Sequence, residues 1–260
     1  MELGLGRKTI IVTGAASGIG AAIARLLAAE GVAAEGVGGL VLTDRDAEGL
    51  TQIASELAAV PVEAVAADLL DPAAPSAIAV AAVARFGRID GLVNAAGLTT
   101  RGSFRTGTAE IWDAVFAVNG RAGFLLMQAA IADMMLRGAG GTIVNILSMN
   151  AHCGIPDLAI YAASKGAMLT LTKNAAHAHM ANSIRVNGIN LGWVATETER
   201  RIQTELLGKN WETQVAATQP LGRLVSADEC ARLAVFLLSD ASTPMSGAVI
   251  DLEQKVAGAI

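Results

Sequence analysis

Aromatic residues and cysteines are scarce in this chain of 260 residues. Phenylalanine, tryptophan and tyrosine together make up 3% of the sequence, and the one tyrosine is Tyr161. Cysteine occurs twice, at Cys153 and Cys230. Two cysteines in a chain of this length do not build the disulfide framework of a small secreted domain, so we expect both to be free thiols.

The sequence also lacks basic clusters and long apolar runs. Its formal net charge is −5, and no run of lysine and arginine could follow the phosphates of a nucleic acid. The most apolar stretch, 124–135, contains Gln128 and Asp133 and is too short to span a bilayer. The first four residues do not resemble a basic and apolar signal peptide. These absences predict a soluble cytoplasmic protein that binds neither nucleic acid nor a membrane.

Small aliphatic residues dominate the remaining composition. Hydrophobic residues make up 53% of the chain, and its 28 glycines suit close packing of helices on a sheet. Short β-branched runs alternate with longer helical stretches. The pattern predicts strands at 9–12, 40–43, 62–66, 92–94, 142–146, 185–189 and 248–251. It predicts helices at 21–30, 46–57, 72–86, 108–137 and 161–181.

This alternation is typical of an α/β protein with a parallel sheet. We predict a single doubly wound Rossmann-type domain over residues 1–260, with a mostly parallel seven-stranded sheet and helices on both faces. The link 32–39 before the second strand is long and rich in glycine, and we interpret it as a surface loop insertion.

A glycine-rich turn separates the first strand from the first helix. It reads Thr13-Gly14-Ala15-Ala16-Ser17-Gly18-Ile19-Gly20, with the spacing G-x-x-x-G-x-G. Glycines allow the backbone to approach a pyrophosphate, and the helix N-terminus offers unpaired N–H groups and a partial positive charge. We predict that this turn binds a dinucleotide through Gly14, Ser17, Gly18, Ile19 and Gly20. The alternative is a turn with a structural role only.

Asp44 ends the second predicted strand. An acid at this position can accept hydrogen bonds from the adenosine ribose hydroxyls and would repel a 2′-phosphate. The sequence therefore predicts NAD in preference to NADP. Two alternatives stay open: Arg45 could pair with a 2′-phosphate, and Asp44 could simply cap the following helix.

Tyr161 and Lys165 lie four residues apart, which places them on one face of a predicted helix. A nearby ammonium favours the phenolate form of a tyrosine, whose ordinary pKa of about 10 makes it a poor base near neutrality. Ser148 ends the fifth predicted strand, and strand ends face the ligand crevice in doubly wound sheets. These residues predict a proton-transfer site, against the alternative of a surface helix pair.

Further motifs follow in the same order and spacing as in a known family. They are Asn94-Ala95-Ala96-Gly97, Asn119, and Arg185-Val186-Asn187-Gly188-Ile189-Asn190. With the glycine turn and the Tyr161/Lys165 pair, they resemble the short-chain dehydrogenase/reductase family over almost the whole chain. The resemblance is closest to sugar- and polyol-dehydrogenase-like members.

The resemblance implies a role for each catalytic residue. Tyr161 is expected to be the general acid/base, and Lys165 to lower the pKa of Tyr161 and bind the nicotinamide ribose. Ser148 is expected to position the substrate oxygen, and Asn119 to support a proton relay through water to Lys165. The remaining residues expected at the cofactor are Asp68 on the adenine, Leu69, Asn94, Ala95, Gly97, Val194 and Thr196.

The substrate region departs from the family pattern. Leu191 stands where the family usually has proline, and Asp251-Leu252-Glu253 replaces Asp-Gly-Gly near the C-terminus. We expect a substrate loop at about 191–217, with a helix over 197–207 as its mobile lid. Asn150, His152 and Trp193 are predicted to line the substrate pocket, although His152 could equally be a solvent-exposed loop residue.

These observations predict an NAD-dependent oxidoreductase that transfers hydride between the cofactor and an alcohol or carbonyl, with a small polar sugar or polyol as substrate. We expect no metal, because His177 and His179 point to different faces of their helix. The alternatives are a dinucleotide-binding regulator without catalysis and a reductase of a larger apolar ketone. The family resemblance further implies a homotetramer packed through 108–137 and 161–181.

Overall fold

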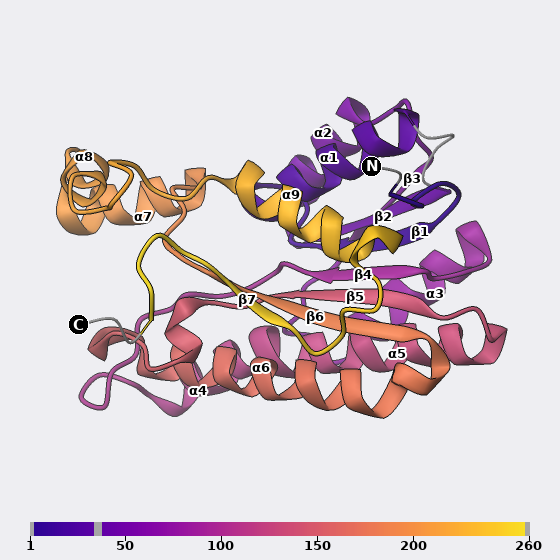
Figure 1. Ribbon diagram of the computed structural model, residues 1–260. Coiled ribbons are helices and arrows are strands. Elements are labelled where there is room, and N and C mark those ends of the chain that lie inside the picture. Colours follow the sequence, from indigo (N-terminus) through magenta and orange to yellow (C-terminus); the bar gives the residue numbers. More distant parts are fainter. Residues whose placement is uncertain (1–2, 34–37, 258–260) are drawn as a thin grey trace.

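Seven parallel strands form one sheet in the order β3-β2-β1-β4-β5-β6-β7 (Figure 1). The computed structural model describes residues 3–33 and 38–257. The strands are β1 (Thr9–Thr13), β2 (Gly39–Asp44), β3 (Val62–Ala66), β4 (Gly91–Asn94), β5 (Gly141–Ile146), β6 (Ile184–Leu191) and β7 (Val249–Leu252). This is the doubly wound α/β fold that the sequence predicts, and its strands agree with the predicted ones within two residues at each end.

The central strands are buried on both faces, which explains their continuous apolar runs. Every residue of β1 and of β6 is buried. The edge strands β3 and β7 are only partly buried. The order of the strands reverses between β1 and β4, and ligands of doubly wound sheets bind at such a switch point.

Helices cover the sheet in two layers, one above and one below it in Figure 1. One core cluster packs α1 (Gly18–Ala33), α2 (Ala47–Glu56) and α9 (Ala227–Leu238) onto the first face. A second cluster packs α3 (Ala74–Phe86), α5 (Gly123–Arg137) and α6 (Ala159–His179) onto the opposite face.

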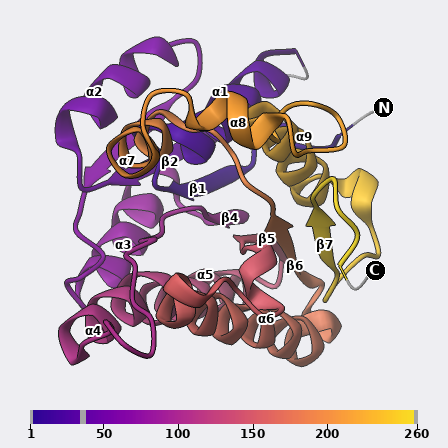
Figure 2. The same ribbon diagram turned by 90° about the vertical axis from the view of Figure 1, so that its left-hand side faces the viewer.

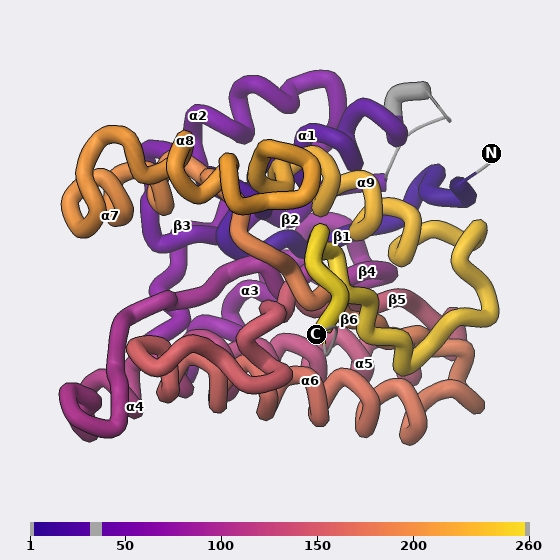
Figure 3. The backbone as a smooth tube through the Cα atoms, turned by 60° about the vertical axis from the view of Figure 1, so that its left-hand side comes forward, coloured from indigo at the N-terminus to yellow at the C-terminus, as the bar shows by residue number. Residues whose placement is uncertain are grey.

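The carboxyl ends of the strands meet at one edge, on the left of Figure 1 and facing the viewer in Figure 2. The paired helices α7 (Glu197–Leu207) and α8 (Trp211–Ala216) stand on one side of this edge. α4 (Ala109–Phe116) lies on the other side. The tube in Figure 3 shows the same separation between α7 and α4.

Several helices differ from the prediction. α1 extends three residues beyond the predicted 21–30 at each end, and α8 was not predicted. α9 is absent from the predicted set, although a capping box between Ser226 and Glu229 starts it. α3 begins at Ala74, two residues later than predicted, so Pro75 rather than Pro72 occupies its first turn. In the predicted loop insertion at 32–39, residues 34–37 lie outside the described part of the chain.

The predicted helix at 108–137 is continuous, but a π-helical segment, Ala117–Ala122, joins α4 to α5. The resulting helix Ala109–Arg137 has 29 residues and a mean hydropathy of 1.4 in its most apolar window, enough to cross a membrane by length and composition. The sequence prediction that no apolar segment reaches this length was therefore wrong. In that window, 61% of the residues are buried within the fold, as in the core helix of a globular protein.

Candidate active site

The glycine turn lies between β1 and α1 at the switch point. Gly14 has a φ of +66°, and a Cβ on it would lie 2.9 Å from the Cα of Ala96. A Cβ on Gly20 would lie 2.1 Å from the carbonyl oxygen of Gly14. Both positions therefore require glycine, because the turn folds tightly against the start of α1 and against the segment after β4. The hydroxyl of Thr13 fixes that segment by accepting hydrogen bonds from the backbone N–H groups of Ala95 and Ala96, each at 3.0 Å.

Asp44 holds the same turn from the second strand. Its carboxylate accepts hydrogen bonds from the backbone N–H groups of Ala16 and Asp46, each at 3.1 Å. Asp46, and not Asp44, caps α2 by accepting from the N–H of Gly49. The capping alternative for Asp44 was therefore wrong. Because a carboxylate can accept about four hydrogen bonds, Asp44 keeps capacity for ribose hydroxyls.

The other predicted cofactor residues lie along the same edge. Asp68 is exposed beyond β3, and its carboxylate accepts from the N–H of Leu70. Leu69 is buried and lines a small cavity beside Lys165. Across the edge, a Cβ on Gly18 would lie 3.2 Å from a methyl carbon of Thr196, so the start of α7 lies against the glycine turn. Val194 forms a β-bridge with Val225.

Tyr161, Lys165 and Ser148 come together below this edge. Tyr161 and Lys165 are buried one turn apart in α6, and the Nζ of Lys165 lies 5.8 Å from the centre of the Tyr161 ring. Ser148 follows β5, is buried, and begins a short 3-10 helix, Met149–Ala151. The alternative of a surface Tyr161/Lys165 pair was therefore wrong.

The charges around Tyr161 differ from the prediction. Burial raises the pKa of the phenol above its ordinary value, a hydrogen bond with Ser148 lowers it, and the negative charge of Glu199 raises it again. The expected lowering of the Tyr161 pKa by Lys165 does not appear. The ammonium donates instead to the carbonyl oxygen of Ile146 at 2.8 Å. Burial also lowers the pKa of Lys165 to about 8.

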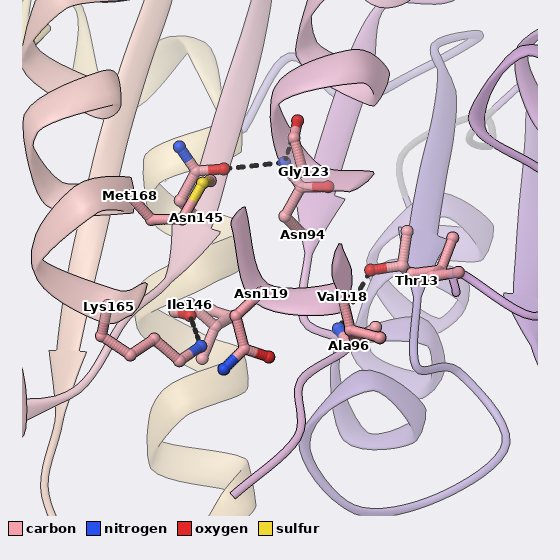
Figure 4. Close-up of a pocket in the computed structure, with 11 residues that line it drawn as sticks. Thr13, Asn94, Ala96, Val118, Asn119, Gly123, Asn145, Ile146, Lys165 and Met168 are labelled. Atoms are coloured by element: carbon pink, nitrogen blue, oxygen red, sulfur yellow. Dashed lines mark hydrogen bonds between the residues drawn. The ribbon is translucent and has the colours of Figure 1, made fainter. Parts of the chain in front are cut away.

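Asn119 lies in the π-helical segment, a local geometry found often at functional sites. Its side chain accepts from the N–H of Leu98 at 2.7 Å and donates to the Leu98 carbonyl oxygen and the Ser164 hydroxyl. Asn119 and Lys165 line a cavity of about 10 Å³ (Figure 4). A polar cavity of this size is close to the minimum for one water molecule.

Buried amides extend the site into the sheet. The Asn94 side chain donates to Asn145 at 2.8 Å, and Asn145 donates to the hydroxyl of Thr172 (Figure 4 shows the first bond). The side-chain oxygen of Asn94 is buried and has no partner among the residues that the structure describes. Sequence reasoning missed Asn145, Thr172 and Ser164. A buried asparagine within an apolar strand was the available signal for Asn145.

The predicted substrate residues lie in two groups. Asn150 lies beside Ser148 and donates to its hydroxyl through both its backbone and its side chain. The His152 imidazole faces Asp251 and Asn190, at 3.1 Å from each. Trp193 stacks on Trp211 across from α6, with ring centres 5.5 Å apart. The structure thus places Asn150 beside Ser148 and Trp193 beside α8, and it leaves His152 exposed and turned toward β6 and β7.

A cradle for a dinucleotide beside a buried tyrosine, serine and lysine defines an oxidoreductase of the nicotinamide-dependent class. Comparison with known proteins agrees. A sequence profile described as Enoyl-(Acyl carrier protein) reductase matches residues 14–254. D-threitol dehydrogenase of Mycolicibacterium smegmatis is 36% identical over 248 residues, which cover 94% of this chain and 91% of that protein.

Two further similarities span the whole fold. 2-(S)-hydroxypropyl-CoM dehydrogenase 3 of Xanthobacter autotrophicus is 33% identical over 256 residues, or 96% of each chain. L-sorbose reductase from Gluconobacter frateurii, solved with NADPH and L-sorbose, matches 100% of both chains with a TM-score of 0.92 and 28% identity.

This chain belongs to the short-chain dehydrogenase/reductase family. The resemblance seen in its sequence is thus confirmed. It is an enzyme that acts on alcohol and keto groups with a nicotinamide cofactor.

Proposed function

We propose that this enzyme oxidises a small polar alcohol, a sugar or a polyol, with NAD, and reduces the corresponding carbonyl in the reverse direction. The observation that carries this proposal is the burial of Tyr161 next to Ser148 and Lys165 at the carboxyl edge of the sheet. A proton-transfer group needs a reacting oxygen within hydrogen-bond reach, and the Ser148 hydroxyl next to Tyr161 can hold that oxygen there.

The residues of the edge fit a dinucleotide. The backbone cradle at Gly14 and Gly20 is too tight for any side chain and leaves the N-terminus of α1 for a pyrophosphate. Asp44 can accept the ribose hydroxyls of NAD, and its negative charge would oppose the extra phosphate of NADP. L-sorbose reductase was solved with NADPH, so the preference for NAD rests on Asp44 and is open to direct test.

The mechanism assigns proton movement to the protein. The bound nicotinamide supplies the hydride chemistry, and its oxidised form carries a positive charge that would favour the Tyr161 phenolate. In oxidation, the phenolate oxygen of Tyr161 takes the hydroxyl proton while Ser148 holds the substrate oxygen. The proton taken up by Tyr161 can then pass to Lys165 as Lys165 releases its own proton to solvent through the cavity that it shares with Asn119, so that both groups return to their starting state.

The polar wall around Ser148 favours a polyhydroxylated substrate. Asn150 lies at this wall, and Trp193, which stacks on Trp211, is the main large apolar residue that we expect in the pocket. Hydroxyl groups left unpaired on burial are costly, whereas a pocket for a steroid or fatty chain is mostly apolar. The names of D-threitol dehydrogenase and L-sorbose reductase support a polyol or sugar. The name of the 2-(S)-hydroxypropyl-CoM dehydrogenase indicates a competing substrate class, a hydroxypropyl group attached to CoM.

A panel of sugars, polyols, hydroxy acids and long-chain alcohols, followed by the absorbance of reduced nicotinamide, tests the proposal. We expect turnover of a sugar or polyol with NAD, and Tyr161→Phe to lower it by roughly 10²–10⁴-fold while leaving NAD binding intact. Activity on long-chain alcohols with none on any sugar or polyol would contradict the substrate class. Tyr161→Phe with nearly normal activity would remove Tyr161 from the mechanism.

An apolar face on α4 and α5 supports assembly into a homotetramer. Trp112 and Phe124 are 48% and 43% exposed, and Trp112 stacks on Phe116 with ring centres 4.4 Å apart. Phe116 and Phe124 line a groove with Leu171 of α6. We expect this surface to be covered by a second copy in a cytoplasmic enzyme, and light scattering of Phe124→Glu to show a smaller particle than the wild type.

A further inference from the structure

A carboxylate in the lid stands close to the reacting end of the site. Glu199 lies in the first turn of α7, where Thr196 caps the helix by accepting from the Glu199 N–H at 3.2 Å. Thr196 itself lies against Gly18 of the glycine turn. The first turn of α7, which carries Glu199, therefore lies beside the glycine turn. The negative charge of Glu199 also raises the pKa of the Tyr161 phenol.

The lid holds this carboxylate in place. One oxygen, Oε1, accepts hydrogen bonds from the Trp193 indole and the Gln203 side-chain amide, each at 2.8 Å. Trp193 is fixed in turn by stacking on the buried Trp211. An ion pair between Arg200 and Glu212 joins α7 to α8 at 2.9 Å.

Two side-chain oxygens, one of Glu199 and one of Gln203, accept no hydrogen bond from the residues that the structure describes. The second carboxylate oxygen of Glu199 receives no hydrogen bond from the described residues. The side-chain oxygen of Gln203 is buried, on a residue only 5% exposed, and also has no partner. Since an unsatisfied buried acceptor costs stability, the Gln203 oxygen suits a donor brought by a ligand, and the partly exposed Glu199 carboxylate can accept a further one.

The charges nearby do not neutralise Glu199. Arg200, the adjacent cation on α7, is paired with Glu212, and Arg101 lies 3.8 Å from Asp157. Lys165 donates to the Ile146 carbonyl oxygen. The first two turns of α7 therefore carry a negative charge that has no salt-bridge partner among the described residues, together with hydrogen-bond acceptors.

We propose that Glu199 determines substrate specificity: with the Gln203 oxygen it binds hydroxyl groups of a neutral polyhydroxylated substrate and excludes substrates that carry a carboxylate, sulfonate or phosphate near the reacting carbon. This inference rests on the proposed function. A hydroxyl can donate to Glu199, whereas a second anion meets like charge in a partly desolvated site, where repulsion is stronger than in water.

The test compares the best polyol of the substrate panel with the aldonate of the same carbon chain. We expect wild-type kcat/KM to favour the polyol by at least about tenfold, given the strength of like-charge repulsion at such sites. Glu199→Gln should reduce this ratio by about tenfold or more, and Glu199→Asp, which keeps the charge, should retain most of it. Glu197→Gln, an exposed acid two residues earlier in α7, is the matched control and should leave the ratio unchanged.

The pH profile gives a readout that does not depend on the choice of anion. Glu199 raises the pKa of Tyr161, so removing its charge should move the rising limb of kcat/KM for polyol oxidation to lower pH. Two results would overturn the proposed role of Glu199 and leave the proposed function intact. One is a wild type that uses polyol and aldonate equally; the other is a Glu199→Gln enzyme whose ratio of kcat/KM values and pH profile are both unchanged. A wild type that oxidises no alcohol in the panel would instead contradict the proposed function, and with it the proposed role of Glu199 in excluding anionic substrates.

Discussion

Lys165 is a residue whose removal should stabilise the protein while inactivating it. Burial lowers its pKa from 10.5 to about 8. Each pKa unit corresponds to about 1.4 kcal/mol, so keeping the buried ammonium charged at pH 7 costs folding about 3 kcal/mol. Lys165→Met removes this cost but leaves the Ile146 carbonyl without its donor, a loss of about 1–3 kcal/mol. We expect the variant to be more stable at pH 7 by up to about 2 kcal/mol.

The dependence on pH separates this effect from a simple change in packing. Above about pH 8 the folded protein releases the Lys165 proton, whereas the unfolded chain keeps it up to about 10.5. The wild type therefore gains stability from this group as pH rises through that window, and the advantage of Lys165→Met shrinks. Thermal melts without cofactor at pH 7 and 9.5 measure the stability difference between Lys165→Met and the wild type and its change with pH. A difference of 1 kcal/mol moves Tm by roughly 2–4 °C for a domain of about this size.

Lys173, an exposed lysine in the same helix, provides the control. Lys173→Met should change Tm little at either pH. If Lys165→Met melts at or below the wild-type temperature at pH 7, with a difference that does not vary with pH, then the ammonium carries no desolvation cost and the reasoning fails. We also expect Lys165→Met to weaken NAD binding as well as turnover. A loss of turnover alone would argue against contact with the ribose.

Three further predictions concern the cofactor, the substrate wall and the core. Asp44→Ala should weaken the binding of NAD and strengthen that of NADP, so that the two Kd values come closer together. A wild type that binds NADP more tightly than NAD would show that a group other than Asp44 determines the cofactor preference. Asn150→Leu and His152→Leu should each raise KM for the substrate more than they change NAD binding, and unchanged KM would place them outside the pocket. Arg185→Leu should lower the free energy of unfolding by about 3–5 kcal/mol in denaturant melts, because the buried guanidinium holds carbonyl and hydroxyl groups of three segments; a loss under 1 kcal/mol would contradict that role.

The sheet could be predicted from the sequence because each strand has a local signature. A fully buried strand such as β6 gives a continuous β-branched run, and the partly buried β3 is still bounded by a proline and a following acid. α9 escaped prediction although its capping box at Ser226 was available as a local signal. The continuity of Ala109–Arg137 was predicted, but its π-helical segment was not.

The site was predictable in composition but less so in its electrostatics. Spacing alone placed Tyr161 and Lys165 on one helix face, and the end of β5 placed Ser148 beside them. The pKa of Tyr161 could not be read in the same way, because its burial and the approach of Glu199 depend on how the lid packs against the sheet. Residues brought together from three separate elements have no spacing that a sequence pattern could detect.

Two polar groups that are costly in the free protein lie where a ligand would give them partners. Lys165 is an ammonium buried at an energetic cost, and Asn94 has a buried oxygen without a partner among the described residues. Both line the small cavity at the carboxyl edge. Polar groups that are costly in the free protein gain partners when water, cofactor and substrate enter, so part of the binding free energy comes from satisfying them. We therefore expect a bound dinucleotide and substrate at the carboxyl edge to stabilise the enzyme by giving these groups partners.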